Sequence, residues 1–294
     1  GRGQRPLLRH PCCRPSETLS RPHPNQMHSG RGRASPGDSV TIPILLYHHL
    51  DPELEESDTT LHPERFEAQM RLLKEKGFNT VDFDDLTAFV GHGKPLPENP
   101  VIVTFDDGYM SNYTYAFPVL RELEMNAVIF PVGSSVGHDR FYKDTQFELT
   151  PHFGQDEIRE MLDSGVICFG SHTYDMHQWP PFEEVSPARQ NILMLPGESE
   201  AEYRQALTAD CACQKELFRS LGLSVPTVIA YPMGQYTELS DEIVRACGYT
   251  VTLTTDPSRI NTVVCGDPES LIDMGRLTVL PEYTDEDLLA YLLP

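Results

Sequence analysis

The sequence lacks any long apolar run. No stretch of its 294 residues approaches the roughly 18 to 20 consecutive apolar residues of a membrane-spanning helix. The N-terminus also lacks the apolar core of a secretory signal. We therefore predict no transmembrane segment and see no signal peptide in this chain.

Paired cysteines are equally scarce. The seven cysteines are odd in number, and no two of them stand at C-x-x-C spacing. The pair Cys211-x-Cys213 lies in a helical pattern and is a candidate metal or redox pair, although packing alone accounts for it as well. The cysteines do not fix the cellular compartment.

Positive charge is in short supply over most of the chain. The sequence has 23 basic and 44 acidic residues, for a net charge of -21. Residues 1–40 hold seven Arg and only two acidic residues, so the remaining body is more acidic still. An acidic body repels nucleic acid and anionic lipid, and it favours a neutral or cationic ligand. The charge could also serve solubility alone.

Residues 1–40 are rich in Arg, Pro, Ser and Gly and show no periodicity. We predict a disordered basic tail here, either a remnant of upstream sequence or, as an alternative, a basic arm for nucleic acid. A single folded domain is expected over residues 41–294.

Strand and helix patterns alternate through that domain. Such alternation predicts parallel strands joined by helical crossovers. Repeats over about 250 residues indicate an α/β fold, a distorted (β/α) barrel of seven or eight mostly parallel strands, with its chemistry at the carboxyl ends of the strands. The expected strands are 42–47, 80–81, 101–105, 127–131, 166–170, 227–231, 249–253 and 277–280. The expected helices are 63–76, 83–90, 113–123, 155–164, 199–221, 238–247 and 285–292.

Two adjacent carboxylates leave the end of one predicted strand. Asp106 and Asp107 follow the apolar run Val101-Ile102-Val103, and Gly108 allows the backbone to turn directly after them. Because neighbouring side chains of a strand point in different directions, one Asp can bind a metal while the other handles a proton. Solvated turn residues would give the same pair.

Histidines follow two other predicted strands. His172 and His177 come just after the strand 166–170, and with one carboxylate they form a His₂Asp set that leaves coordination positions open. His48 and His49 end the first strand, and a His beside a metal site can act as a general acid. Strand alternation turns these two side chains to different faces, so one of them is expected to enter the site.

A fixed turn ends the strand 227–231. Tyr231, Pro232, Met233 and Gly234 form a loop in which Pro and Gly restrict the backbone, and such a loop can present an N–H to a developing oxyanion. Many loops contain Pro and Gly, so this signal is weak when taken alone.

The chain resembles the polysaccharide deacetylases of carbohydrate esterase family 4, the NodB-type domain. The resemblance lies in three motifs in this order: Thr-Phe-Asp-Asp-Gly, Ser-His-Thr with a second His, and Tyr-Pro-x-Gly. The resemblance covers roughly residues 40–281. It implies that Asp106 is the catalytic base, and that Asp107, His172 and His177 bind one divalent metal. Zinc is the first expectation, with Ni²⁺, Co²⁺ or Fe²⁺ also suited to these ligands.

The chain departs from the common family pattern in ways that resemble its permuted poly-N-acetylglucosamine deacetylase branch. The two histidines stand five residues apart, and residues 271–281 contain no His to act as the acid. In that branch a Tyr-His near the start of the domain supplies the acid, which implies His48. No Arg closely precedes Pro232, so Arg276 is a candidate for the missing residue that orients the base. Met233 replaces an aromatic residue, which leaves only a backbone role there.

The resemblance implies hydrolysis of N-acetyl groups from an amino-sugar polymer such as poly-N-acetylglucosamine. It also implies action outside the cell or in the cell envelope. Peptidoglycan or chitin oligomers, or a small acetylated amine or ester, are alternative substrates. A sugar-binding protein that has lost catalysis is a different class of function, and the altered spacing and missing motif residues leave it open.

Overall fold

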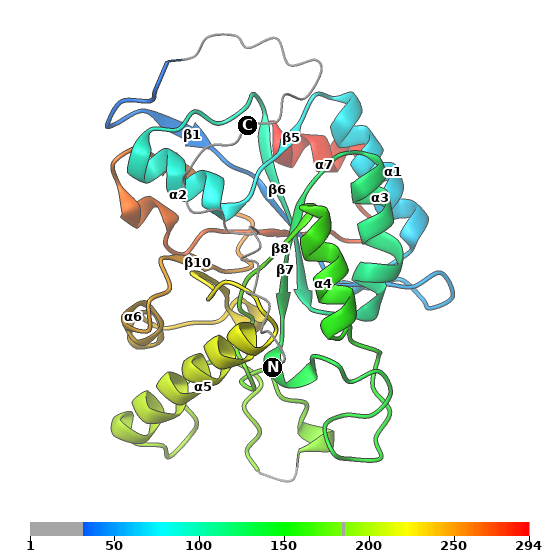
Figure 1. Cartoon of the computed structure of the whole chain (residues 1–294), viewed down its shortest axis with the longest axis vertical. Helices are drawn as coiled ribbons and strands as arrows, with labels where there is room; N and C mark the ends of the chain where they lie inside the picture. The colour runs from blue at the N-terminus through cyan, green and yellow to red at the C-terminus, as the bar shows by residue number, and fades with distance from the viewer. Residues whose placement is uncertain (1–31, 184–185, 294) are drawn as a thin grey trace, which may run out of the picture.

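The computed structural model describes residues 32–183 and 186–293 (Figure 1). The helices are α1 (Pro63–Glu75), α2 (Phe83–His92), α3 (Phe117–Glu122), α4 (Gln155–Ser164), α5 (Glu200–Ser220), α6 (Glu238–Ala246) and α7 (Asp285–Leu292). The strands are β1 (Ser39–Thr41), β2 (Ile44–Tyr47), β3 (His49–Leu50), β4 (Thr60–Leu61), β5 (Asn79–Thr80), β6 (Pro100–Asp107), β7 (Ala127–Pro131), β8 (Ile167–Phe169), β9 (Val228–Ala230), β10 (Val251–Leu253), β11 (Thr262–Val264) and β12 (Leu277–Thr278).

The predicted helices and strands are confirmed in order and type, with small shifts at their ends. Part of the helix expected over 113–123 is a π-helical turn, Asn112–Ala116, which leads into α3. The short strands β1, β3, β4 and β11 were not predicted. Most of the predicted tail, residues 1–31, lies outside the described residues.

Local capping explains where several helices begin. Each of α2, α5, α6 and α7 starts at a side chain that accepts a hydrogen bond from a backbone N–H three residues later. The residue at that later position bonds back to the cap, which satisfies two N–H groups that a helix start leaves free. The four caps are Asp82, Ser199, Thr237 and Thr284.

The expected closed barrel of seven or eight strands is not confirmed, because the described residues form no closed sheet. A six-stranded parallel sheet has the order β12-β2-β6-β7-β8, with β5 paired to the start of β6, while β9 and β10 form a separate parallel pair. Two isolated β-bridges connect these sheets, one between Ser171 and Ile229 and one between Leu253 and Met274. The strands beside the gaps have only two or three residues, which is too short for a continuous ladder.

One hydrophobic core contains residues of both the larger sheet and the β9–β10 pair. Ile44, Ile102 and Val128 of the larger sheet belong to the same buried cluster as Val228 and Val251 of the β9–β10 pair. Alternate residues of a strand point to opposite faces, so these positions share the inner face. The two sheets therefore curve around one interior, although no closed ladder joins them.

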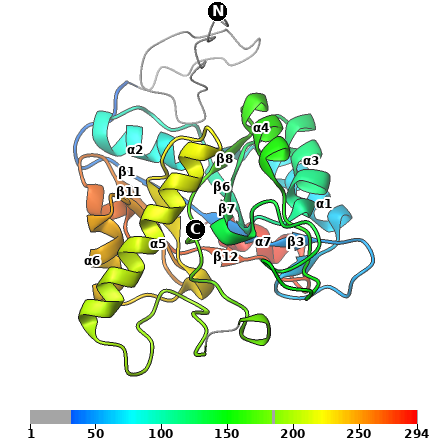
Figure 2. The same cartoon turned by 60° about the horizontal axis from the view of Figure 1, so that its bottom comes forward.

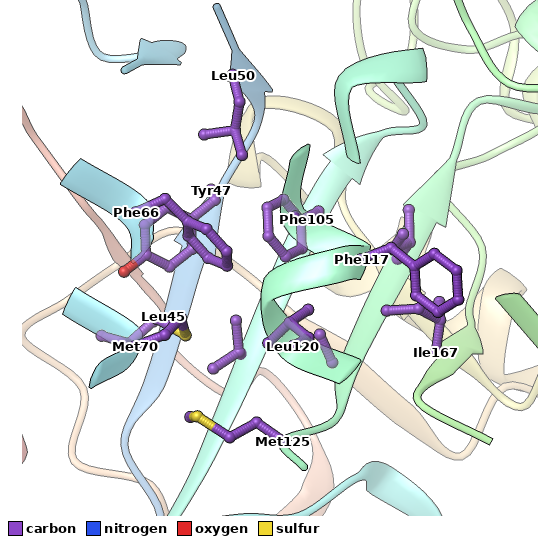
Figure 3. Close-up of a cluster of buried hydrophobic side chains, with 14 of the residues drawn as sticks. Leu45, Tyr47, Leu50, Phe66, Met70, Phe105, Phe117, Leu120, Met125 and Ile167 are labelled. Carbon is purple, nitrogen blue, oxygen red and sulfur yellow. The ribbon is translucent and has the colours of Figure 1, made fainter. Parts of the chain in front are cut away.

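A second core fills the outer face of the larger sheet, where α1 and α3 cover it (Figure 3). The Tyr47 ring lies 5.1 Å from that of Phe66 and 5.5 Å from that of Phe105, between centroids. The Tyr47 hydroxyl donates to Gln69 of α1 at 2.8 Å. This packing fixes the carboxyl ends of β2 and β6. His48 directly follows β2, and Asp106 is the second-to-last residue of β6.

Helices α5 and α6 pack on the opposite side of the molecule from α1, α3 and α4 (Figures 1 and 2). Cys211 of α5 is buried in a hydrophobic cluster that includes Ile229 of β9, whereas Cys213 is exposed, so the two thiols of the candidate pair lie in different environments. Within residues 32–183 and 186–293, no helix combines the length and the apolar character needed to cross a membrane.

Candidate functional site

The two carboxylates stand where β6 leaves the sheet. Strand β6 is buried along its whole length and pairs in parallel with β2 and β7. Asp107 has φ 71° and Gly108 has φ 85°, so the backbone turns sharply at the strand end. A Cβ on Gly108 would lie 2.8 Å from Cβ of Pro131, which explains the glycine. This turn directs the two carboxylates to different neighbours.

Asp106 is held by a buried arginine from the far end of the chain. Arg276, fully buried just before β12, donates from its two terminal nitrogens to the two carboxylate oxygens of Asp106, each at 2.7 Å. Its Nε donates to the carbonyl of Thr254 at 3.2 Å. The arginine proposed from sequence is therefore in direct contact with Asp106, through the bidentate geometry that matches a carboxylate.

This pairing decides the charge of Asp106. Burial opposes ionisation of the carboxyl, but the charge of Arg276 outweighs it and holds the pKa of Asp106 well below its ordinary value. The carboxyl is therefore ionised, which is the form that can accept a proton.

Asp107, His172 and His177 meet beside this pair. Oδ1 of Asp107 lies 3.6 Å from Nε2 of His172 and 3.5 Å from Nε2 of His177. Each imidazole donates its Nδ1–H to a backbone carbonyl at 2.8 Å, that of Ala230 for His172 and that of Gln190 for His177. A carbonyl can only accept, so in the neutral rings the proton stays on Nδ1 and the Nε2 lone pairs face Asp107.

These three residues fit a cation. Oδ1 of Asp107 is buried and has no hydrogen-bond partner in the part of the chain that the structure describes. Burial lowers the pKa of His172, which favours its neutral, ligating form. The ligand atoms of the three residues lie within 4.8 Å of one another. Three electron-pair donors around an unsatisfied carboxylate oxygen form a set suited to a divalent metal.

Of the two histidines after β2, His49 contacts residues other than the two carboxylates. Its Nδ1 lies 2.9 Å from Oγ of Ser111, and its Nε2 lies 3.5 Å from a carboxylate oxygen of Asp51. Nδ1 of His48 is buried and has no partner among the described residues. His48 also lies close enough to Asp106 and Asp107 to lower the pKa of both. His48 is therefore the histidine that faces the two carboxylates.

The loop after β9 meets the site through its backbone. The Tyr231 side chain is fully buried and donates to Asp241 of α6 at 2.6 Å, so its phenol is part of the core. Pro232 is buried as well, whereas Met233 is half exposed and has the left-handed φ of 58°. Because Ala230, one residue before this loop, accepts from His172, the loop start is tied to the candidate metal ligands.

A pocket of about 200 Å³ opens from this cluster. Asp107 and His177 form part of its lining, together with residues that the sequence patterns did not single out, chiefly Tyr109, His152 and Trp179. Tyr109 packs between the rings of His49 and His152. The one available signal was Trp179, the only tryptophan of the chain, two residues after His177.

Comparison with known proteins identifies related chains. Residues 93–252, more than half of the chain, match a family model described as polysaccharide deacetylase. The chain is similar to the poly-beta-1,6-N-acetyl-D-glucosamine N-deacetylase of Escherichia coli (strain K12), with 29% identity over 211 residues. That alignment covers 66% of this chain and 30% of the relative. The chain spans less than two thirds of the length of the curated relatives that it matches first.

Two solved structures share the fold. A de-N-acetylase from Aggregatibacter actinomycetemcomitans superposes with a TM-score of 0.70 at 22% identity, over 86% of this chain and 100% of the other. IcaB from Ammonifex degensii superposes with a TM-score of 0.66 at 27% identity, over 88% of this chain and 98% of the other. The α/β fold with a parallel sheet is therefore shared with known deacetylases.

Proposed function

Because the chain belongs to the polysaccharide deacetylase family, we propose that it hydrolyses N-acetyl groups of an amino-sugar polymer and releases acetate. The names of its relatives support poly-β-1,6-N-acetylglucosamine as the polymer. The observation that carries the proposal is the contrast between two adjacent carboxylates. Both oxygens of Asp106 accept hydrogen bonds from Arg276, whereas Oδ1 of Asp107 has no hydrogen-bond partner among the described residues.

Asp107, His172 and His177 would hold one divalent metal, with zinc the first expectation. Such an ion, when bound, supplies Lewis acidity that lowers the pKa of water toward 7 and polarises a carbonyl. His172 and His177 are oriented for this role by their Nδ1–H bonds to backbone carbonyls.

Asp106 is proposed as the base that takes a proton from the attacking water. Its Oδ2 lies 3.8 Å from Nε2 of His172, so it borders the candidate ligands while Arg276 holds it still. A carboxylate with so low a pKa is a weak base, so Asp106 would act on a water whose own pKa a bound ion would lower. Arg276 is proposed as the residue that orients this base.

His48 is proposed as the acid that protonates the leaving amine of the sugar. Its Nδ1 has no partner among the described residues, so nothing there competes for its proton. The backbone N–H of Met233 is proposed as a donor to the oxyanion, with Tyr231 and Pro232 holding that loop in place. The exposed Met233 side chain has no part in this role.

Peptidoglycan or chitin oligomers are the alternative substrates of the same chemistry. The acidic body of the chain suits a polymer that gains positive charge as acetyl groups leave. We propose an extracellular or cell-envelope substrate, because the relatives' named polymer is of that kind. A sugar-binding protein without catalysis is the competing class.

Acetate release from defined oligomers tests the proposal. We expect zinc-loaded protein to deacetylate β-1,6-linked N-acetylglucosamine oligomers faster than chitin oligomers or peptidoglycan fragments. Asp106→Asn should lower kcat by about 10²- to 10⁴-fold, the range for loss of general acid–base catalysis. The exposed Asp58→Asn serves as the matched control and should change nothing.

The outcomes separate the candidate functions. Near-normal turnover by Asp106→Asn with metal bound would refute the role of that carboxylate. No acetate from any oligomer, despite bound metal and measurable sugar binding, would favour the sugar-binding protein.

A further inference from the structure

The pocket beside the candidate metal ligands reaches farther than one acetyl group requires. It has a volume of about 200 Å³, and its lining continues from Asp107 and His177 to Tyr142, Trp179 and Phe182. The aromatic part comes from the segments after β7 and β8, which form long loops at the bottom of Figure 1. The reacting site and an aromatic wall therefore share one continuous space.

Trp179 is the most unusual residue of that wall. It is 55% exposed, although a large aromatic side chain gains free energy when it leaves water. Beside it, Phe182 stacks on Phe147 with ring centroids 4.9 Å apart and lies 5.6 Å from the ring of Tyr142. The wall thus offers an exposed indole with packed aromatic rings next to it.

The segment that carries Trp179 is held in place by polar contacts. Asp175 accepts from Ser134 at 2.8 Å and from Gln178 at 3.1 Å, and its carboxylate lies 2.9 Å from Nζ of Lys143. Lys143 also pairs with Glu183 at 2.8 Å, just past Phe182. Because these bonds bracket Trp179 on both sides in sequence, its position is largely formed before any ligand arrives.

Another part of the pocket lining is polar and has an unsatisfied atom. His152 is only 8% exposed, and its Nδ1 is buried without a hydrogen-bond partner among the described residues. A buried polar atom without a partner costs free energy until a ligand or water satisfies it. His152 packs against Tyr109, whose ring centroid lies 4.9 Å away, so its ring is fixed.

We propose that Trp179 and His152 form a second sugar position, which binds the N-acetylhexosamine unit next to the one being deacetylated. This inference rests on the proposed function. A pyranose ring has apolar C–H faces and polar edges, so one unit can stack on the indole while a hydroxyl or amide group reaches His152. The pocket is continuous with the candidate metal ligands, which makes a neighbouring unit of the same polymer its occupant. The enzyme would then prefer oligomers over a single sugar.

The chain provides its own probe, because Trp179 is its only tryptophan. Its fluorescence therefore reports on this position alone. We would titrate zinc-loaded Asp106→Asn protein, in which turnover is blocked under the proposed mechanism, with a β-1,6-linked N-acetylglucosamine pentamer. A saturable blue shift is expected with the pentamer, and none with monomeric N-acetylglucosamine at the same concentration of sugar units.

Variants in the otherwise unchanged protein test the consequence for turnover. Trp179→Ala should raise KM for the pentamer about tenfold, with little change in kcat, and Trp179→Phe should restore most of the loss. His152→Phe should raise the pentamer KM as well. The control is Ile260→Ala, a truncation of another exposed apolar side chain that does not line the pocket, and it should leave KM unchanged.

The outcomes keep the two proposals apart. Acetate release from the pentamer without any change in Trp179 fluorescence, and with unchanged KM in Trp179→Ala, would overturn the second sugar position and leave the proposed function standing. Equal KM increases for pentamer and monomer would also overturn it. If neither acetate release nor a fluorescence change occurred with any N-acetylated oligomer, both proposals would fall.

Discussion

The two sides of the candidate site differ in how their buried polar atoms are satisfied. On one side, both carboxylate oxygens of Asp106 accept hydrogen bonds from Arg276, which itself is fully buried. On the other side, Oδ1 of Asp107 and Nδ1 of His48 and of His152 are buried without a partner among the described residues. The adjacent residues Asp106 and Asp107 thus lie in opposite situations.

This difference indicates that the side with Asp106 maintains the geometry of the site, whereas the side with Asp107 binds ligands. Leaving a buried donor or acceptor unsatisfied costs about 1–3 kcal/mol, so such atoms persist where a ligand completes them. The paired side needs nothing more and can orient Asp106. The unpaired side has places for a cation and for sugar groups.

The largest effect is expected when the partner of Asp106 is removed. Arg276→Met should lower the free energy of unfolding by about 3–5 kcal/mol, because it leaves the buried Asp106 charge without its partner. Chemical denaturation measures this loss. The matched control is Arg65→Met, which removes an equally bidentate partner of Glu56 from a side chain that is 37% exposed. It should cost less than about 1 kcal/mol. Equal losses in the two variants would contradict the contrast.

A pH titration of stability tests His152 on the unpaired side. Burial lowers the pKa of His152 from 6.5 to about 4, so the unfolded chain binds this proton at higher pH than the folded chain does. Stability from this group is present above pH 6.5 and is lost as the pH falls toward 4. Wild type should therefore lose up to about 3 kcal/mol more than His152→Gln between pH 7 and pH 4.

Parallel pH dependence of the two proteins would contradict this account of His152. The comparison is made by denaturation at several pH values in metal-free protein. Both proteins retain His172 and His177, so the contributions of those residues cancel.

Metal addition tests the role of Asp107, whose Oδ1 has no hydrogen-bond partner among the described residues. Zinc at a hundred times its dissociation constant should stabilise the folded protein by about 2.7 kcal/mol, since binding to the folded state alone shifts the unfolding equilibrium. Thermal denaturation before and after chelation measures this effect, and metal analysis gives the stoichiometry. Asp107→Asn should abolish tight binding, whereas Asp106→Asn should still bind one ion per chain. Loss of binding in both variants alike would remove the division between the two carboxylates.

The smallest expected effect concerns the loop after β9. Met233→Gly should raise the free energy of unfolding by about 0.5–1 kcal/mol, because glycine relieves a left-handed residue at some cost in chain entropy. Acetate release should be unchanged, since the backbone N–H remains. Met194→Gly is the control, an exposed methionine without a positive φ, and should be destabilising. A large loss of turnover in Met233→Gly would show that the side chain itself contributes.

Local sequence patterns placed the acidic and histidine residues at strand ends, and the family resemblance then chose Asp107 over Asp106 as the candidate metal ligand. Asp107 follows a buried strand, and His172 and His177 follow another, so each could be placed at a strand end without knowledge of the fold. Arg276 was reached only as a replacement for a missing residue, since nothing around it signals a partner 170 residues away. His152 was missed because no predicted strand leads into it, whereas Tyr109 follows Gly108 directly after the predicted strand 101–105 and was not considered as a site residue. The closed barrel was expected from the number of repeats, which says nothing of how many residues each ladder contains.

The sequence by itself determined the order of the helices and of the strands in the six-stranded sheet and the β9–β10 pair. It also determined the strand-end positions of the acidic and histidine residues and the acidic character of the body. Those properties depend on residues close together in the chain. Only the tertiary structure decided that both oxygens of Asp106 are paired with Arg276 while Oδ1 of Asp107 has no partner among the described residues, and that Trp179 and His152 share a pocket. Hydrogen-bond satisfaction and shared cavities depend on which distant segments meet, and that follows from packing of the whole chain.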